Sequence, residues 1–231
     1  MEHEQFFAHA LFQLGTLVVR DTVVTTWAVL LALWLACGYL ARHLRSSPGL
    51  IQTAAEGLVL SAEDAVRQVL PRHVSMVLPF ILTLWTFLVV ANLVGLIPGL
   101  HSPTRDPSAT AALAVLVFLS VHWFGIRAQG LKGYLRHYLS PTPILLPFHV
   151  ISEITRTLAL AVRLFGNMMS LELVALLLVW VGGLLVPIPI LLLHIVEALV
   201  QAYIFGMLAL IYIASAIQTQ TPRAGEPANE E

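Results

Sequence analysis

The chain has 231 residues, of which 58% are hydrophobic and 11% are charged, and its formal net charge at pH 7 is −1. Soluble domains carry about 25% charged residues, so this composition excludes the soluble class and indicates a protein that crosses a membrane several times. The small net charge, without a basic run, gives no indication of nucleic-acid binding. Cys37 is the only cysteine and cannot form an intrachain disulfide. No His, Cys or carboxylate set has metal-ligand spacing, so neither a metal nor another cofactor is expected.

The first 72 residues predict one membrane helix and one surface helix. Residues 1–22 are acidic, unlike the basic start of a signal peptide, and are expected to remain as an outer N-terminal segment. Residues 23–41 hold no charge and approach the ~20 residues that a crossing needs, so they predict the first membrane helix. In residues 50–72, apolar side chains recur every three or four positions while charged ones occupy the other faces. This pattern predicts an amphipathic helix at the membrane interface.

The remaining apolar segments, within residues 74–217, predict four further crossings. Residues 74–100 are long enough for a tilted crossing, and residues 108–126 predict the next one. Residues 148–181 and 190–217 flank a turn rich in Gly and Pro, and predict a long, tilted antiparallel hairpin. The expected fold is therefore all-α and polytopic, with about five crossings plus one interfacial helix in a single membrane domain, followed by a disordered tail at residues 221–231.

The basic residues of the loops predict the orientation. Eight Lys and Arg residues lie in loops on one side of the expected membrane, whereas only Arg20 and Arg105 lie on the other. Because basic loops remain in the cytoplasm, we expect the N-terminus outside and the tail inside.

Charged residues interrupt the segment 151–172, which is otherwise apolar enough to cross a membrane. An Arg at the centre of a bilayer costs about 2.5–3.5 kcal/mol on insertion scales, and its guanidinium does not shed its charge. Helical spacing places Arg156 and Arg163 on one face, with Asn167 one turn beyond Arg163. Arg163 therefore either pairs with a carboxylate inside the bundle, or faces a partner or a water-filled path and handles charge there.

The segment RLFGN at residues 163–167, with Glu172 five residues on, resembles the motif of subunit a of the F-type ATP synthase membrane sector. The agreement extends to His194 and Gln201 in HIVEALVQAYIF, and to the run that contains Asn92. These residues fall in the order of that family, so the resemblance covers about residues 74–217.

The resemblance implies a non-catalytic stator subunit of a rotary ATP synthase in the bacterial inner membrane. Its partners would be the c-subunit ring and the b-subunit peripheral stalk, and Arg163 would correspond to the family's essential arginine. In that family the subunit forms two proton half-channels and, through the arginine, exchanges protons with the c-ring carboxylates. The expected path residues beyond Arg163 are Asn167, Glu172, His194, Glu197 and Gln201 toward the outer side, and Glu153 and Arg156 on the cytoplasmic side.

Several alternatives stay open at this point. Sodium could replace protons, because the ion ligands would lie mostly on the c subunit. A secondary ion transporter would need inverted repeats, and an intramembrane hydrolase would need a pair such as Ser170 and His194. Glu197 either carries protons or pairs with His194, one turn away. In an ideal hairpin, Gln201 lies at a different depth in the membrane from Arg163, so a contact between them requires the helices to tilt. His122 is expected to have no role in the ion path.

Overall fold

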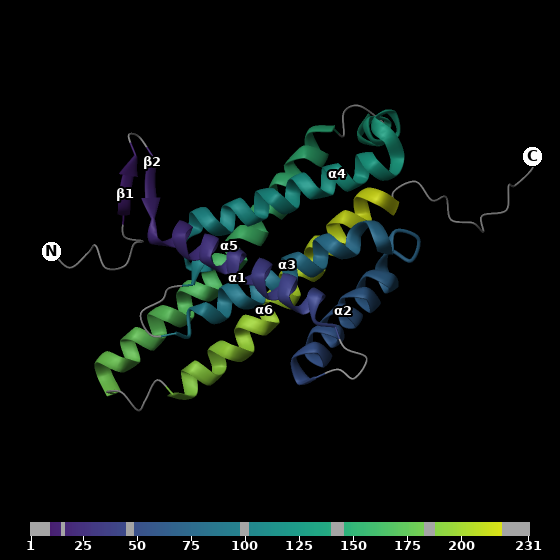
Figure 1. Ribbon diagram of the computed structural model, residues 1–231. Helices are drawn as coiled ribbons and strands as arrows, with labels where there is room; N and C mark the ends of the chain where they lie inside the picture. Colours follow the sequence, from purple (N-terminus) through teal and green to yellow (C-terminus); the bar gives the residue numbers. More distant parts are fainter. Residues whose placement is uncertain are drawn as a thin grey trace, which may run out of the picture.

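The computed structural model describes residues 10–14, 17–44, 49–97, 102–139, 146–182 and 188–218, and within these ranges the chain is mainly a bundle of long helices (Figure 1). The side chains of residues 10–21 and of some helix positions, Glu172 among them, also lie outside the described part. The predicted tail, residues 221–231, lies outside the described residues as well.

A short antiparallel hairpin precedes the first helix. Strand β1 (Ala10–Leu14) pairs with β2 (Leu17–Arg20), and Leu14 lies opposite Leu17. The sequence predicted only an outer segment here, because short apolar runs without a clear period do not distinguish a strand from a helix. Helix α1 (Asp21–Arg42) follows at once and confirms the first predicted membrane helix.

Helix α2 (Leu50–Val69) ends three residues earlier than predicted. The cause is Pro71, which disfavours helical backbone at the preceding residue, Leu70 (φ −134°, ψ 66°). Only the second half of its apolar stripe packs against the protein, since Ala62 and Val66 are fully buried whereas Ile51 is 81% exposed. The predicted interfacial position of this helix stays a prediction.

Helix α3 (Val74–Val94) ends six residues before the predicted limit, so the expected 27-residue crossing was too long. A network of buried polar groups holds the chain beyond this end, where the 3-10 turn η2 (Pro103–Arg105) lies. Ser102 donates through its hydroxyl to the carbonyl of Ala91 at 2.9 Å, and Thr104 Oγ1 donates to Asn92 Oδ1 at 2.8 Å. Asn92 in turn donates to the carbonyl of Ala198 in the last helix at 3.2 Å, which ties the loop to the centre of the bundle.

Helix α4 (Pro107–Leu139) contains the predicted crossing at residues 108–126 and continues well beyond it. Asp106 caps its start, because Oδ1 accepts the backbone N–H of Ser108 at 2.9 Å while Oδ2 accepts the hydroxyl of Thr22 in α1 at 2.9 Å. Gly130 bends the helix with φ 75°, a conformation that Gly adopts without steric cost.

Helices α5 (Leu146–Gly182) and α6 (Ile188–Gln218) form the predicted antiparallel hairpin. At ~1.5 Å per residue the 37 residues of α5 extend ~55 Å, more than the ~30 Å hydrocarbon core, which fits the tilt that its length predicts. Helix α6 occupies the centre of the bundle and contacts α2, α3, α4 and α5 (Figure 1). Its inward face carries the fully buried Ala198, Ala202 and Ala209, small residues that let helices approach closely.

Five helices in the described part are long and apolar enough to cross a membrane. They are Thr22–Arg42, Val74–Val94, Pro107–Tyr134, Pro147–Ala175 and Leu191–Ile217. The predicted all-α, polytopic membrane fold with five crossings is confirmed, with the β1–β2 hairpin as an addition.

Candidate functional site

Arg163 lies near the middle of α5 on the face that points away from the bundle. Its side chain is exposed, as are those of Leu158 and Val162, whereas Leu164 is fully buried against the other helices. Among the described residues, no carboxylate pairs with the guanidinium and no hydrogen bond holds it. The side chain of Glu172 is not part of that set. Within the described residues, the charged side chain of Arg163 therefore faces away from the bundle and makes no hydrogen bond or ion pair that would stabilise it.

One turn beyond Arg163, a hydrogen bond joins the two arms of the hairpin. Asn167 Nδ2 donates to Gln201 Oε1 at 2.8 Å, and the side chain of Gln201 is only 1% exposed. Gln201 thus lies at the depth of Asn167, and no described hydrogen bond links it to Arg163 directly. The Nε2 of Gln201 is buried and has no hydrogen-bond partner among the described residues.

His194 lies two turns before Gln201, ~10 Å along α6. It is 8% exposed, and its buried Nε2 likewise lacks a described partner. Glu197 is half-buried, and within the described residues neither a hydrogen bond nor an ion pair joins it to His194, so the pairing that was one of its two alternatives is not observed. Among the described residues, two buried polar nitrogens without a hydrogen-bond partner therefore lie ~10 Å apart along the inward side of α6.

Asn92 adds a polar group that the sequence did not assign to the site. It is fully buried in α3 and donates to the carbonyl of Ala198, which lies between His194 and Gln201 on α6. In the sequence, Asn92 is marked by its uncharged amide within an apolar segment, but such a segment alone does not show which neighbouring helix the side chain contacts.

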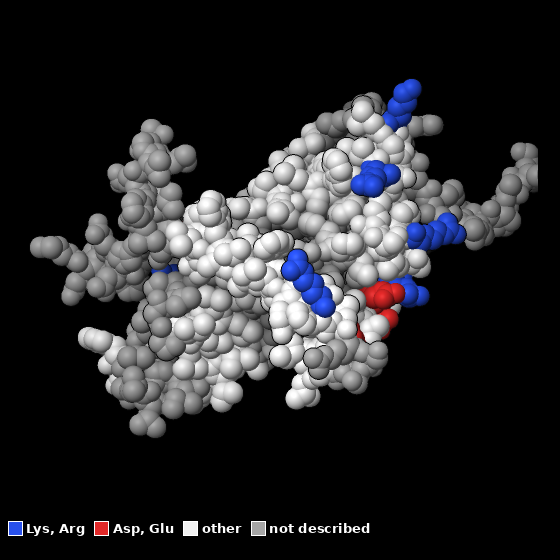
Figure 2. Space-filling view, viewed as in Figure 1, with Lys and Arg blue, Asp and Glu red and all other residues white. Residues whose placement is uncertain are grey.

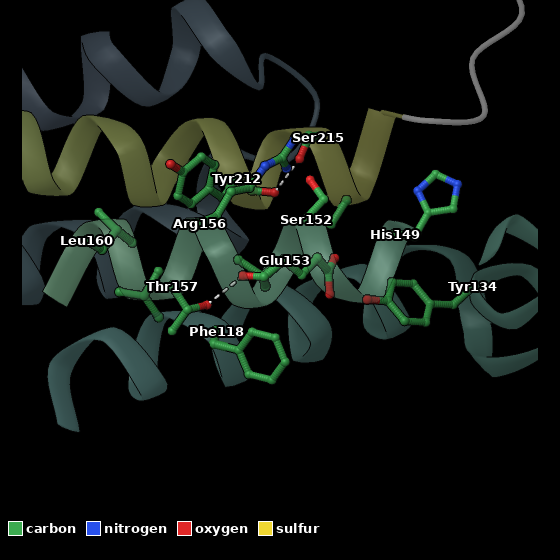
Figure 3. A pocket seen from close by; sticks show the side chains of 13 residues that line it. Phe118, Tyr134, His149, Ser152, Glu153, Arg156, Thr157, Leu160, Tyr212 and Ser215 are labelled. Carbon is green, nitrogen blue, oxygen red and sulfur yellow. Dashed lines mark hydrogen bonds between the residues drawn. The ribbon is translucent and has the colours of Figure 1, made fainter. Parts of the chain in front are cut away.

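A second polar region lies toward the other end of α5, where a cavity of about 220 Å³ opens between α4, α5 and α6 (Figure 3). Glu153 and Arg156 of α5 line it together with Tyr212 of α6. The Arg156 guanidinium lies over the Tyr212 ring, 5.3 Å from its centroid, a cation–π arrangement. In Figure 3, Arg156 points toward α6 beside Tyr212 and Ser215, and Glu153 lies on the opposite side.

Glu153 is paired with a residue that the sequence did not implicate. The Nε2 of His122 in α4 lies 3.1 Å from Glu153 Oε2. Residues 31 positions apart on separate helices give no shared pattern in the sequence, so only the packing of α4 against α5 brings them together. The expectation that His122 is incidental overlooked this contact.

A model of the family described as ATP synthase A chain matches residues 22–214, which include Arg163, Asn167, His194 and Gln201. The chain belongs to the ATP synthase A chain family.

Curated bacterial relatives of the family agree over nearly the whole chain. ATP synthase subunit a 2 of Pelobacter propionicus is 64% identical over 222 residues, covering 96% of this chain and 97% of its own length. ATP synthase subunit a 1 of Hahella chejuensis is 60% identical, covering 90% and 88%, and ATP synthase subunit a of Legionella pneumophila is 56% identical, covering 94% and 95%. The predicted family is thus confirmed.

Family membership establishes the general role of the chain. It is a non-catalytic stator component in the ion-translocating membrane sector of an ATP synthase, and a multi-pass protein of the bacterial inner membrane.

Proposed function

We propose that this chain forms two proton half-channels and exchanges protons, through Arg163, with the carboxylates of a rotating c-subunit ring. The exchange couples ion flow to ATP synthesis or hydrolysis. The observation that supports this most is the exposed guanidinium in the middle of a crossing helix, without an ion pair to any described residue. A cation at this depth is costly, and an outward position is useful only if a partner brings a negative charge to it.

The exchange follows from the permanent charge of the guanidinium. A rotor carboxylate that approaches Arg163 is stabilised in its ionised form, so it loses its proton to one half-channel. When the same carboxylate moves on into lipid, it must first take up a proton from the other half-channel, because burial of an unpaired charge is too costly. Arg163 between the two halves also repels a proton that would pass straight through.

The two polar regions supply the half-channels. Toward the outer side we assign Asn167, Glu172, His194, Glu197 and Gln201. This is supported by the buried nitrogens of His194 and Gln201 that have no hydrogen-bond partner among the described residues. Toward the cytoplasm we assign Glu153 and Arg156, which line the cavity between α4, α5 and α6.

The orientation that this assignment requires places the N-terminus outside. It is supported by the basic side chains, most of which gather at the end of the molecule where α2 and the C-terminal part of α4 lie (Figure 2). The b-subunit peripheral stalk is the other expected partner, as the resemblance implies.

The test replaces Arg163 by Ala in the complete ATP synthase and measures ATP-driven acidification of inverted membrane vesicles. Acidification should be lost. Arg127→Ala is the matched control, because Arg127 is also exposed and has no ion pair among the described residues, but lies in α4 outside both polar regions. Normal acidification by the Arg163→Ala complex would refute the proposal, and ATP-driven uptake of labelled sodium instead of acidification by the unmodified complex would show the sodium alternative.

A further inference from the structure

His122 and Glu153 meet at the wall of the cavity between α4, α5 and α6, at 3.1 Å between Nε2 and Oε2. Their side chains are 30% and 23% exposed, so water reaches a pair that the surrounding helices otherwise enclose. Glu153 precedes Arg163 by ten residues, which is ~15 Å along α5. The cavity continues along the same helix past Thr157 to Leu160, one turn short of Arg163.

The second ring nitrogen of His122 determines how many protons the pair holds. Nδ1 lies 2.8 Å from the backbone carbonyl of Phe118, and a carbonyl oxygen only accepts, so Nδ1 carries a hydrogen. A neutral ring would then present the lone pair of Nε2 to a carboxylate oxygen, and two acceptors do not attract one another at this distance. One further proton must therefore lie between Nε2 and Oε2, on either the ring or the carboxyl group.

In the described contacts, His122 and not Arg156 is the ion-pair partner of Glu153. The nearest fixed cation on α5, Arg156, is directed to the ring of Tyr212, and no ion pair joins it to Glu153 among the described residues (Figure 3). Imidazole differs from a guanidinium as a partner of Glu153, because it can take up and release a proton. Among the described residues, the other titratable groups that line the cavity are His149 of α5, Tyr212 of α6 and Tyr134 of α4, whose ring centroid lies 5.9 Å from that of His122.

We propose that His122 and Glu153 form a proton-holding pair through which protons pass between the cytoplasmic water and the inner half-channel. This rests on the proposed function of the chain and adds His122 to it. A hydronium ion that arrives in the cavity protonates the carboxylate, and the pair returns to its one-proton state when it releases a proton to water on the side of Arg163. Only O–H and N–H bonds form and break, and no electron is transferred.

The chain contains a matched control for the local geometry of His122. The Nδ1 of His43 also lies near the carbonyl four residues earlier, that of Tyr39 at 2.9 Å. The ring centroids of His43 and Tyr39 are 4.3 Å apart, the same separation as between His122 and Phe118. No carboxylate pairs with His43 among the described residues.

The experiment measures ATP-driven acidification by the complete ATP synthase in inverted vesicles, per assembled complex. A group that accepts and donates a proton typically contributes ~10²-fold or more to a transfer step, so His122→Gln should slow acidification at least about tenfold. His122→Lys should be equally slow although it keeps an ion pair with Glu153, and it carries the test if the Gln variant does not assemble. His43→Gln should match the unmodified complex.

A double variant separates a shared proton from two independent effects. His122→Gln combined with Glu153→Gln should be no slower than the slower single variant, since either change removes the same pair. The inference would be overturned if the effects of the two single variants multiplied in the double variant. It would also be overturned if either His122→Gln or His122→Lys retained full activity. If one of these results is found while Arg163→Ala still abolishes acidification, the proposed function remains supported and only the inference about His122 and Glu153 fails. Normal acidification by Arg163→Ala would refute both proposals.

Discussion

The contact between Gly206 of α6 and Trp85 of α3 gives a sharp prediction about what positions the site. A Cβ added at Gly206 would lie 2.7 Å from Cε2 of Trp85 and closer still to Nε1 and Cδ1, whereas ordinary contacts begin at 3.4 Å. Trp85 is 5% exposed, so its ring has little room to withdraw and the two helices must separate by well over half an ångström. Overpacking of this kind costs about 1–3 kcal/mol. A change of this size should also shift α6, which carries Gln201 and His194.

Gly206→Ala should therefore lower the temperature at which heat releases the chain from the purified complex. For a chain of this length, ~2 kcal/mol corresponds to a shift of about 4–8 °C. Native gel electrophoresis after heating measures the midpoint, with Gly57→Ala as control, because a Cβ at Gly57 meets nothing within 4 Å. Adding Trp85→Leu should recover part of the loss. An unchanged midpoint for Gly206→Ala, or strictly additive effects in the double variant, would refute the reasoning.

Two further contacts can be tested in the same way. Asn167→Leu and Gln201→Leu should show a coupling of about 0.6 kcal/mol in a double-mutant cycle of thermal stability, the usual strength of a hydrogen bond between membrane helices, and zero coupling would mean that the bond does not form. Asp106→Ala removes the cap of α4 and the bond from Thr22, so it should cost about 1–2 kcal/mol by the same heat-release measurement, whereas Ser108→Ala, which keeps the capped backbone N–H, should cost less. Equal losses for these two variants would contradict the capping role.

The limits of the helices show which local features a sequence reveals. The hairpin of α5 and α6 was predicted to within two residues at each end, because the turn between them is rich in Gly and Pro. Helix α3 was predicted too long, since Leu96, Ile97 and Leu100 extend the apolar run beyond its end and hydropathy does not register a break in backbone hydrogen bonding.

The candidate site was predictable only in part, for a related reason. The cost of a charge in lipid marks Arg163 from the sequence alone, and the spacing of RLFGN marks Asn167. That Asn167 bonds to Gln201 depends on the axial offset of two helices, which the hydrophobic period does not specify. The pairing of Glu153 with His122 depends in addition on the rotation of α4 about its own axis.

The sequence by itself determined that the chain crosses a membrane five times and holds a permanent cation within one crossing, because apolar length and charge depend only on which side chains follow one another. Tertiary structure decided that this cation faces outward, that a hydrogen bond between two side-chain amides joins the hairpin one turn away, and that a histidine meets Glu153 at the wall of the cavity between α4, α5 and α6. These depend on how long helices rotate and slide against one another, and small buried residues such as Ala198 and Gly206 set that packing through close contact.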